Sequence, residues 1–260
     1  MIFIPRLIAA RGKRQQPFRL RLNRDHPLAF RLVSVVVPDG LGNIIDYCRP
    51  RQSTGNPRSL RARGLAIPGL SWSMSNASTT DLDFTAAPHS AAAVGYINST
   101  GVANNITFLG RYNFVSSSDN QGWAITTNGN TDFRSFIFNN NASTALASTG
   151  VTPAVGDWTL GHSEDGTTRK IYVNGVLNNS ATGLNHTSPT CVSGTGYTSE
   201  QTRFDLYIGA AWNRVLTDQE MLLFHADPFS MFKPDVGFGM LHRYVAPTLR
   251  RSNMFSMFPP

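Results

Sequence analysis

The side chains that could carry out acid–base chemistry are few and lie far apart in the sequence. The chain has three glutamates, Glu164, Glu200 and Glu220. Hydrolysis of a glycosidic bond needs two carboxyl groups that flank the bond within one small site. Glu164 and Asp165 are expected to occupy a turn, and Glu220 stands where a helix is expected to begin. The spacing therefore predicts no pair of catalytic carboxylates.

Histidine-based catalysis is not indicated either. The six histidines are spread over the chain, and no Gly-x-Ser-x-Gly nucleophile motif occurs. His162, beside Ser163 in the segment LGHSEDG, is the best placed of them. No partner stands at a spacing that supports catalysis, so a structural histidine at a hairpin explains it better. We expect no enzymatic activity.

Two short segments offer oxygen ligands of the kind that calcium binds. One contains Asp81 and Asp83, and the other contains Asp119 and Asn120. The alternation of the first two is also typical of a strand, so we expect no cofactor, with calcium as the alternative. The two cysteines, Cys48 and Cys191, lie far apart in the sequence, and whether they pair stays open.

Short strands must position whatever site exists. Turn dipeptides such as Asn128-Gly129 and Asn174-Gly175 separate apolar segments in which every second residue is polar. This pattern predicts an all-β sandwich or jelly roll rather than a βαβ fold. Residues 49–71 and 178–201 are rich in turn-forming residues, and we expect long surface loops there. The expected strands are 32–38, 106–114, 122–127, 133–138, 158–163, 169–173 and 204–209.

One short helix is expected after the last of these strands. Thr217 can cap it, and Glu220 follows at the spacing of a capping box. Pro228 ends the apolar helical segment. Trp212 and Phe224 are expected in the core on either side of the cap.

Three segments together resemble laminin-G-like, concanavalin A-like domains, particularly those of bacteriophage proteins. The first is LYIGAAWNRVL with TDQE and DPFSMF after it (206–232), the second is WTLGHSEDGTTRKIYVNGVL (158–177), and the third is NRDHPLAFRLVSVVVPDG (23–40). The resemblance covers roughly residues 23–234 and implies a concanavalin A-like jelly roll of two antiparallel sheets. It also implies that lectins, adhesion modules and virion parts share the fold. The Glu-x-Asp-x-(x)-Glu motif of the glycosidases that share this fold does not occur.

Charge is distributed unevenly along the chain. Residues 1–63 hold thirteen basic and three acidic groups, a net charge of +10, whereas residues 64–232 hold six basic and twelve acidic groups, a net charge of −6. Residues 233–260 return to +3, with four basic groups and one acidic group. The body is therefore acidic and both ends are basic, which suits partners that meet end against body.

We divide the chain into a basic N-terminal arm (1–24), the sandwich (25–232) and an aromatic, methionine-rich extension (233–260). The alternating segment FRLRL (18–22) is either the first strand of the domain or a strand that pairs with a sheet edge of this or a neighbouring chain. The extension either packs on its own domain or docks on a partner. The predicted partner-binding residues of the two arms are Arg11, Lys13, Arg14, Arg19, Arg21, Phe238, Tyr244, Phe255, Met257 and Phe258.

These features predict a non-enzymatic structural protein located in a virion. The expected role is a phage capsid decoration or cement protein, or another particle-associated protein. Its arms would bind the major capsid protein or other virion subunits in a homo-oligomer or symmetric assembly. The alternative is a carbohydrate-binding module for host glycans, which would use loops and the four tryptophans, Trp72, Trp123, Trp158 and Trp212. No apolar run is long enough to span a membrane, and no nucleic-acid module is present, so we expect neither as a partner.

Overall fold

The computed structural model describes thirteen ranges of the chain. They are 20–38, 44–49, 53–54, 60–61, 64–65, 72–74, 80–84, 88–99, 105–113, 121–139, 144–184, 196–199 and 204–234. Within these ranges the regular elements are β-strands, except for one α-helix and two short 3-10 helices, Pro27–Ala29 and Thr80–Leu82. The predicted all-β fold class is confirmed.

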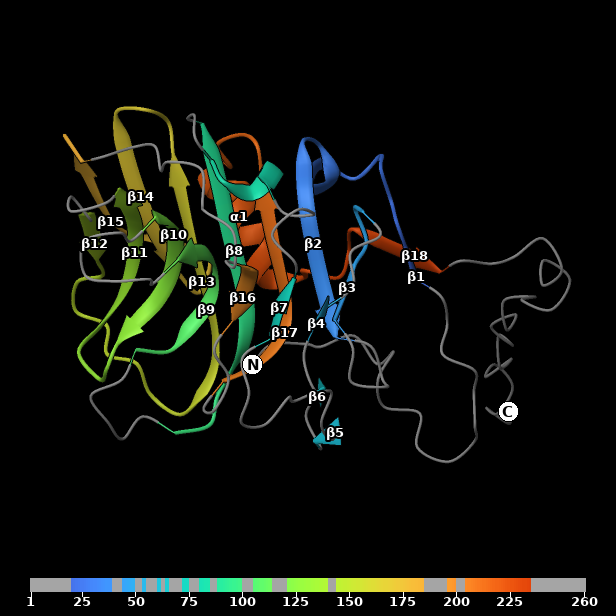
Figure 1. The fold of residues 1–260 in the computed structure, drawn as a ribbon, viewed down its shortest axis with the longest axis horizontal. Helices are drawn as coiled ribbons and strands as arrows, with labels where there is room; N and C mark the ends of the chain where they lie inside the picture. Colours follow the sequence, from blue (N-terminus) through green and yellow to red (C-terminus); the bar gives the residue numbers. More distant parts are fainter. Residues whose placement is uncertain are drawn as a thin grey trace, which may run out of the picture.

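The first of the two large sheets has seven antiparallel strands (Figure 1). Its three middle strands, β13, β8 and β17, are the longest, and Ala91, Ala92 and Ala93 of β8 are fully buried between the neighbouring strands. In order across the sheet, the strands are β15 (Val176–Thr182), β14 (Thr168–Val173), β13 (Gly156–Glu164), β8 (His89–Ile97), β17 (Phe204–Trp212), β2 (Leu32–Pro38) and β3 (Ile44–Asp46).

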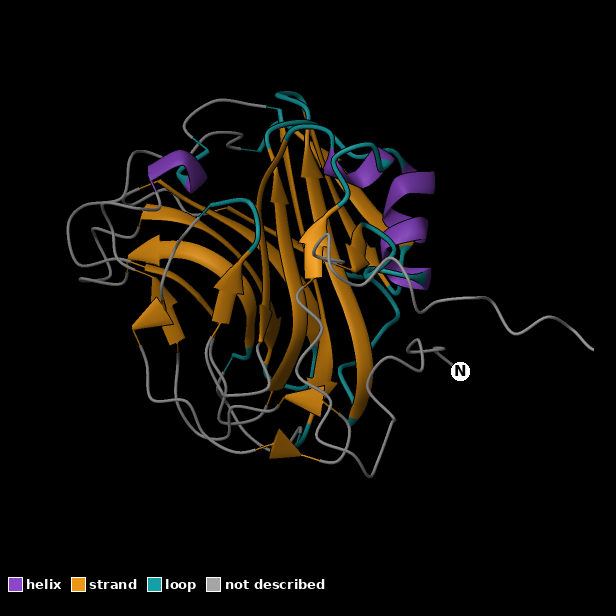
Figure 2. Cartoon of the chain, turned by 90° about the vertical axis from the view of Figure 1, so that its right-hand side faces the viewer, coloured by secondary structure: helices purple, strands orange, loops and turns teal. Residues whose placement is uncertain are grey.

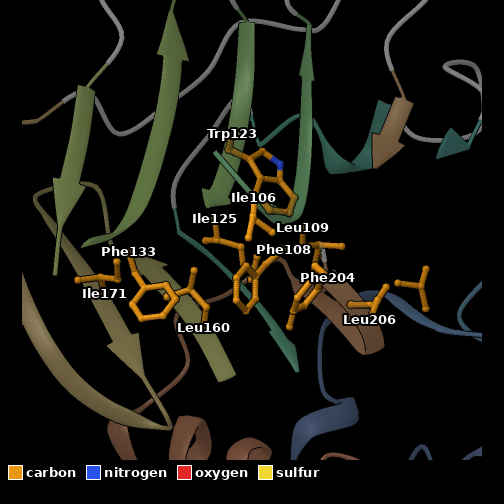
Figure 3. Close-up of a cluster of buried hydrophobic side chains, with 14 of the residues drawn as sticks. Ile106, Phe108, Leu109, Trp123, Ile125, Phe133, Leu160, Ile171, Phe204 and Leu206 are labelled. Carbon is orange, nitrogen blue, oxygen red and sulfur yellow. The ribbon is translucent and has the colours of Figure 1, made fainter. Parts of the chain in front are cut away.

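The second sheet also has seven antiparallel strands. The order is β12 (Thr144–Ala147), β11 (Asp132–Asn139), β10 (Gln121–Asn128), β9 (Thr107–Asn113), β16 (Gly196–Ser199), β7 (Trp72–Met74) and β4 (Ser53–Thr54). The two sheets face one another, because one buried cluster joins Leu160 and Phe204 of the first to Ile125 and Phe133 of the second (Figure 3). This two-layer packing is the β-sandwich that the sequence predicts.

The helix α1 (Asp218–Ala226) covers the outer face of the first sheet (Figure 2). Its capping box is formed as predicted: the backbone N–H of Glu220 donates to Thr217 Oγ1, and the Glu220 carboxylate accepts from the N–H of Thr217. Trp212 and Phe224 are fully buried with their rings edge to face at 5.5 Å, in a second cluster between helix and sheet. Both residues are therefore core residues, as expected.

Two pairs of short strands stand outside the sandwich. Strands β5 (Leu60–Arg61) and β6 (Gly64–Leu65) pair with each other. Strand β1 (Leu20–Leu22) pairs with β18 (Phe232–Pro234), and both lie beside β3 at the end of the molecule away from β15 (Figure 1). The described part of the segment FRLRL, residues 20–22, therefore supplies no strand to either large sheet. It pairs with the chain's own residues more than 200 positions further on.

The expected strands are confirmed, but two other local predictions are wrong. Residues 178–201 are not one long loop, because β15 continues to Thr182 and β16 occupies Gly196–Ser199. Asp81 and Asp83 do not alternate on a strand, since a 3-10 helix at Thr80–Leu82 interrupts the segment. In the loop expected at 49–71, the described residues after Arg49 form only short strands.

Candidate functional site

The glutamates in the described part of the chain hold the fold together. Arg169 Nε donates to Glu164 Oε2 over 2.9 Å, and both side chains are fully buried between the sheets. Arg214 binds Glu220 with two nitrogens, at 2.7 and 2.8 Å, beside the helix cap. Burial raises the pKa of the Glu220 carboxyl, but the hydrogen bonds from Arg214 and Thr217 outweigh it and lower that pKa, which favours the ionised form. Glu164 is the last residue of β13, so the prediction that it lies in a turn is wrong.

His162 is a core residue. Its Nδ1 lies 2.8 Å from Ser135 Oγ of β11, so the contact joins the two sheets. Burial, and after it the charges of His89 and Arg169, lower the pKa of the His162 imidazole well below its usual value, so the ring is neutral. The neighbouring Ser163 points to the opposite face of the sheet, toward the Tyr172 hydroxyl. His162 therefore does not pair with its neighbour Ser163, and the serine that it contacts is Ser135 of the other sheet.

The candidate calcium ligands in the described part are already bound by arginines. Asp83 Oδ1 accepts from Arg111 Nε over 2.7 Å in a buried ion pair, and Asp81 lies 3.3 Å from Arg49. Cations at these distances take the place that a metal ion would need. The other candidates, Asp119 and Asn120, lie outside the described residues. Across the described ranges, no group of three histidine, cysteine or acidic side chains could hold a metal ion.

The three tryptophans whose side chains are described do not form a ligand surface. Trp123 and Trp212 are fully buried, and their indole N–H groups donate to backbone carbonyls of Leu82 and Leu28. Trp158 is half-buried and packs on the sandwich core. The Trp72 side chain lies outside the description. The prediction that Trp123 contacts a glycan is therefore wrong, and Trp212 is a core residue, as expected.

A row of aromatic rings lies instead on the outer face of the second sheet. Alternation along β11 sends Phe133, Ser135 and Ile137 inward, and the intervening residues outward. Phe136 and Phe138 are therefore outward neighbours, and their rings stack at 5.3 Å with planes only 4° apart. Phe138 is buried and Phe136 half-buried.

The row continues onto β9 and ends in polar groups on β10 and β11. Tyr112 lies 6.0 Å from Phe138, and its hydroxyl is 3.1 Å from Thr107 Oγ1. At the other end, the Arg134 guanidinium lies 6.0 Å from the Phe136 ring and binds Asp132 over 2.7 Å. Arg134, Phe136 and Phe138 are successive outward residues of one strand, so they form a continuous line.

At the polar end of the row, the side chains are charged and hydrogen-bonded to one another. Asp132 also accepts from Asn128 Nδ2 at 3.2 Å and from Thr131 Oγ1 at 3.0 Å. Burial opposes ionisation of Asp132, but the hydrogen bonds from Arg134, Asn128 and Thr131 outweigh it and lower the pKa of the carboxyl. Thr126, directly across from Arg134 on β10, is buried, and its hydroxyl oxygen has no hydrogen-bond partner in the described structure.

Sequence reasoning missed this row, although a signal for it was present. In FRSFIF (133–138), Phe133 and Ile137 occupy odd-numbered positions, while Phe136 and Phe138 occupy even-numbered positions. Since odd and even positions of a strand point to opposite faces of its sheet, such a strand has apolar groups on both faces. One of these faces lies outside the sandwich core. Of the predicted arm residues, only Arg21 lies within the described residues, where it is exposed on β1.

Neither a protein-family model nor a curated protein sequence matches the chain. Among solved structures, it is similar to the Trypanosoma rangeli sialidase in complex with 2,3-difluorosialic acid, with 12% identity, a TM-score of 0.57 and coverage of 78% of this chain and 33% of that one. For the same sialidase in complex with sialic acid, the sequence identity is 13% and the TM-score is 0.54, and the match covers 78% of this chain and 34% of that one. For a Ruminococcus gnavus IT-sialidase CBM40 bound to α2,3-sialyllactose, the sequence identity is 10% and the TM-score is 0.48, and the match covers 61% of this chain and 95% of that one. The chain spans about a third of the sialidase structures.

The likeness to the sialidase structures shows the fold, a β-sandwich of jelly-roll type. These structures link the chain neither to phage nor to laminin G. The prediction of a structural virion protein that binds capsid subunits is therefore wrong. They do not test the predicted location or the predicted lack of enzymatic activity, which stay predictions.

Proposed function

We propose that this chain is a carbohydrate-binding module that holds a glycan on the outer face of its second sheet. The observation that carries the proposal is the continuous line of Arg134, Phe136 and Phe138 on β11, extended by Tyr112 on β9. It combines aromatic faces with charged hydrogen-bonding groups on rigid strands.

A sugar ring needs this combination of groups. One face of a pyranose presents mainly C–H groups, while its edge carries hydroxyls. Ligand sites meet such molecules with aromatic side chains and a small number of placed polar groups. Phe136 offers the half-buried ring on which a sugar can lie. Next to that ring, Arg134 and Asn128 supply hydrogen-bond donors and the Asp132 carboxylate supplies acceptors.

The same groups suit binding better than hydrolysis. A general acid for glycoside cleavage needs a carboxyl group whose pKa is raised, so that it holds a proton near neutral pH. The pKa of Asp132 is lowered, and its oxygens already accept hydrogen bonds from Arg134 and Asn128. We therefore propose that this site binds a glycan and does not hydrolyse it.

A glycan array probed with the full chain tests the proposal. The array should include neutral and carboxylated sugars, because Arg134 can meet a carboxylate, and sialosides in particular, because the similarly folded sialidase was solved with sialic acid. For the best ligand, Phe136→Ala should weaken binding about tenfold, the loss expected for one aromatic contact. Phe30→Ala is the matched control, because Phe30 is exposed outside both sheets.

Two outcomes would contradict the proposal. One is an array on which the folded wild-type chain binds no glycan. The other is a bound glycan whose affinity is the same in wild type, Phe136→Ala and Arg134→Gln. Thermal melting of each variant separates loss of the site from loss of the fold.

A further inference from the structure

Exposed apolar side chains gather where the β14–β15 hairpin meets helix α1. In the described part of the chain seven large apolar side chains are exposed, and three of them lie here. They are Val176 and Leu177 at the start of β15 and Leu222 in α1, and we call them the edge patch. Val176 is 61% exposed and Leu222 is 50% exposed. Both side chains thus keep most of the contact area that a partner could cover.

The turn of the hairpin packs directly against α1. Gly175 has a φ of +76°, and a Cβ atom built there would lie 3.1 Å from Leu222 Cα and closer still to His225. Thr159 of β13 ties both elements together, because its hydroxyl lies 2.9 Å from His225 Nδ1 and its N–H donates to Asn174 Oδ1 over 3.0 Å. The edge patch therefore belongs to an ordered surface, and a contact through it costs little additional ordering.

The chain around the edge patch carries no charge over two long stretches. Residues 144–156 and 171–184 contain no aspartate, glutamate, lysine or arginine, although these types make up 15% of the chain. The stretches contain β12 and β15, the outermost strands of the two sheets, which lie at the same end of the sandwich (Figure 1). Depletion of charge together with exposed apolar groups is typical of the centre of a protein interface.

Strand β15 also leaves one backbone edge without a neighbouring strand among the described residues. Proteins commonly protect such edges with charged side chains, proline or β-bulges. The sequence of β15 has neither a charge nor a proline, but its register against β14 shifts at Asn178, which forms a bulge. A bulge interrupts a regular ladder. We therefore expect a partner to meet the side chains of β15 and α1 instead of extending the sheet.

A second copy of this chain fits an uncharged surface better than a charged partner does. Around a two-fold axis the same surface of each copy meets itself, so a charged residue near the axis would meet a like charge. The net charge of the chain is +7, so two copies repel each other, and they repel least where the surface is uncharged. A strongly acidic or basic partner would find no opposite charge on residues 144–156 or 171–184.

We propose that two copies of this chain form a dimer through the edge patch, with α1 and β15 of one copy against α1 and β15 of the other. A stable interface buries about 800 Å² of each partner, more than three side chains supply. The uncharged remainder of β15 completes the contact. Because α1 covers the first sheet and the aromatic row lies on the outer face of the second, the dimer leaves both rows accessible.

Sedimentation equilibrium of the full chain at about 1 to 100 μM, the range that reveals micromolar association, tests this proposal. Wild type should have twice the mass of one chain. The double variant Val176→Glu, Leu222→Glu should raise the dimer dissociation constant at least about 100-fold, because like charges would meet in the contact. The matched control Phe30→Glu, Ile45→Glu places the same charges on exposed apolar residues outside the edge patch and should stay dimeric.

A variant of opposite charge separates a lost contact from a lost fold. Mixing the Val176→Glu, Leu222→Glu protein with a Val176→Lys, Leu222→Lys protein should restore the dimer, since opposite charges then meet. Any of four results would overturn the proposal: a wild type that stays monomeric, a glutamate variant as dimeric as wild type, a control that dissociates equally, or a mixture that forms no dimer. None of these measurements needs a glycan, so failure of the glycan proposal would leave them unaffected.

Discussion

The polar residues that look most reactive in the sequence are buried between the two sheets. His162 is fully buried, contacts Ser135 through Nδ1, and has no hydrogen-bond partner for Nε2 within the described structure. Its ring lies 5.2 Å from that of His89 and 5.6 Å from Trp123. A charged imidazole in these surroundings would lose its hydration without gaining a counterion. The residue therefore contributes to stability only in its neutral form.

The stability of the domain should consequently fall in mild acid. The folded-state pKa of His162 lies below the unfolded value of about 6.5. As the pH drops through that unfolded value, the unfolded chain binds a proton that the folded chain rejects. Stability is thus present above pH ~6.5 and declines below it, by at most about 1.4 kcal/mol per pH unit for this residue. Melting temperatures measured between neutral and mildly acidic pH check this.

The variant His162→Gln removes the titration and keeps a polar group facing Ser135. Its melting temperature should depend less on pH than that of wild type. Burial also lowers the pKa of the half-buried His225, which lies 2.9 Å from Thr159 Oγ1. The variant His225→Gln therefore measures how much His225 contributes to the pH dependence of the melting temperature. If His162→Gln and wild type showed the same pH dependence, the assignment to His162 would be incorrect.

At the scale of elements, α1 is held at its N-terminal end by side chains from two directions. Thr217 and Glu220 complete the capping box. Tyr172 of the first sheet donates to Asp218 Oδ1 over 2.8 Å, and Lys170 lies 3.3 Å away. The Tyr172 hydrogen bond is the main cause of the lowered pKa of Asp218, which keeps a negative charge at the positive end of the helix dipole.

Removing the cap should loosen the helix measurably. Thr217→Ala deletes the hydroxyl that accepts from the Glu220 N–H, and we expect a loss of about 1 kcal/mol in the free energy of unfolding. Gln219→Ala, an exposed change inside the same helix, should leave stability nearly unchanged. Urea denaturation compares the two. Equal midpoints for Thr217→Ala and Gln219→Ala would show that the cap contributes little.

At the scale of the whole molecule, Arg169 joins the two sheets near their β12 and β15 edges. Its Nε donates to Glu164 in the first sheet, while its other nitrogens donate to the carbonyl and hydroxyl oxygens of Thr144 in the second. Asn179 of β15 adds a donor to the Ala147 carbonyl of β12 at 2.8 Å. These bonds close the edge of the sandwich next to the strand that carries the aromatic row.

Breaking this buried ion pair on one side should be costly. Glu164→Gln leaves the Arg169 charge without its carboxylate, and we expect a loss of about 3–5 kcal/mol in the free energy of unfolding. The double variant Glu164→Leu, Arg169→Met removes both charges and should lose less than Glu164→Gln does. Denaturant unfolding of the three proteins checks the order. A double variant less stable than Glu164→Gln would contradict this account.

Local sequence patterns predicted the strands that alternate clearly and missed those that do not. The segment HSAAAVGYI (89–97) forms the central strand β8, although alanine and glycine have low strand propensity. Small residues are required there because the Phe204 ring packs directly against Gly95. Tertiary packing overrode propensity at this position. It likewise placed Trp123, which was offered as a surface contact, into the core, and Phe136 and Phe138, expected only as strand residues, onto an outer face.

The sequence by itself determined the all-β class and the capped helix, since alternation and capping are properties of neighbouring residues. Only the tertiary structure decided which residues share a face or a pair of strands. The line from Arg134 to Tyr112 depends on the register of β9, β10 and β11, and the cationic pair Arg21 and Lys233 depends on a contact across more than 200 residues. Register and long-range pairing are set by the packing of the whole core, which no short segment encodes.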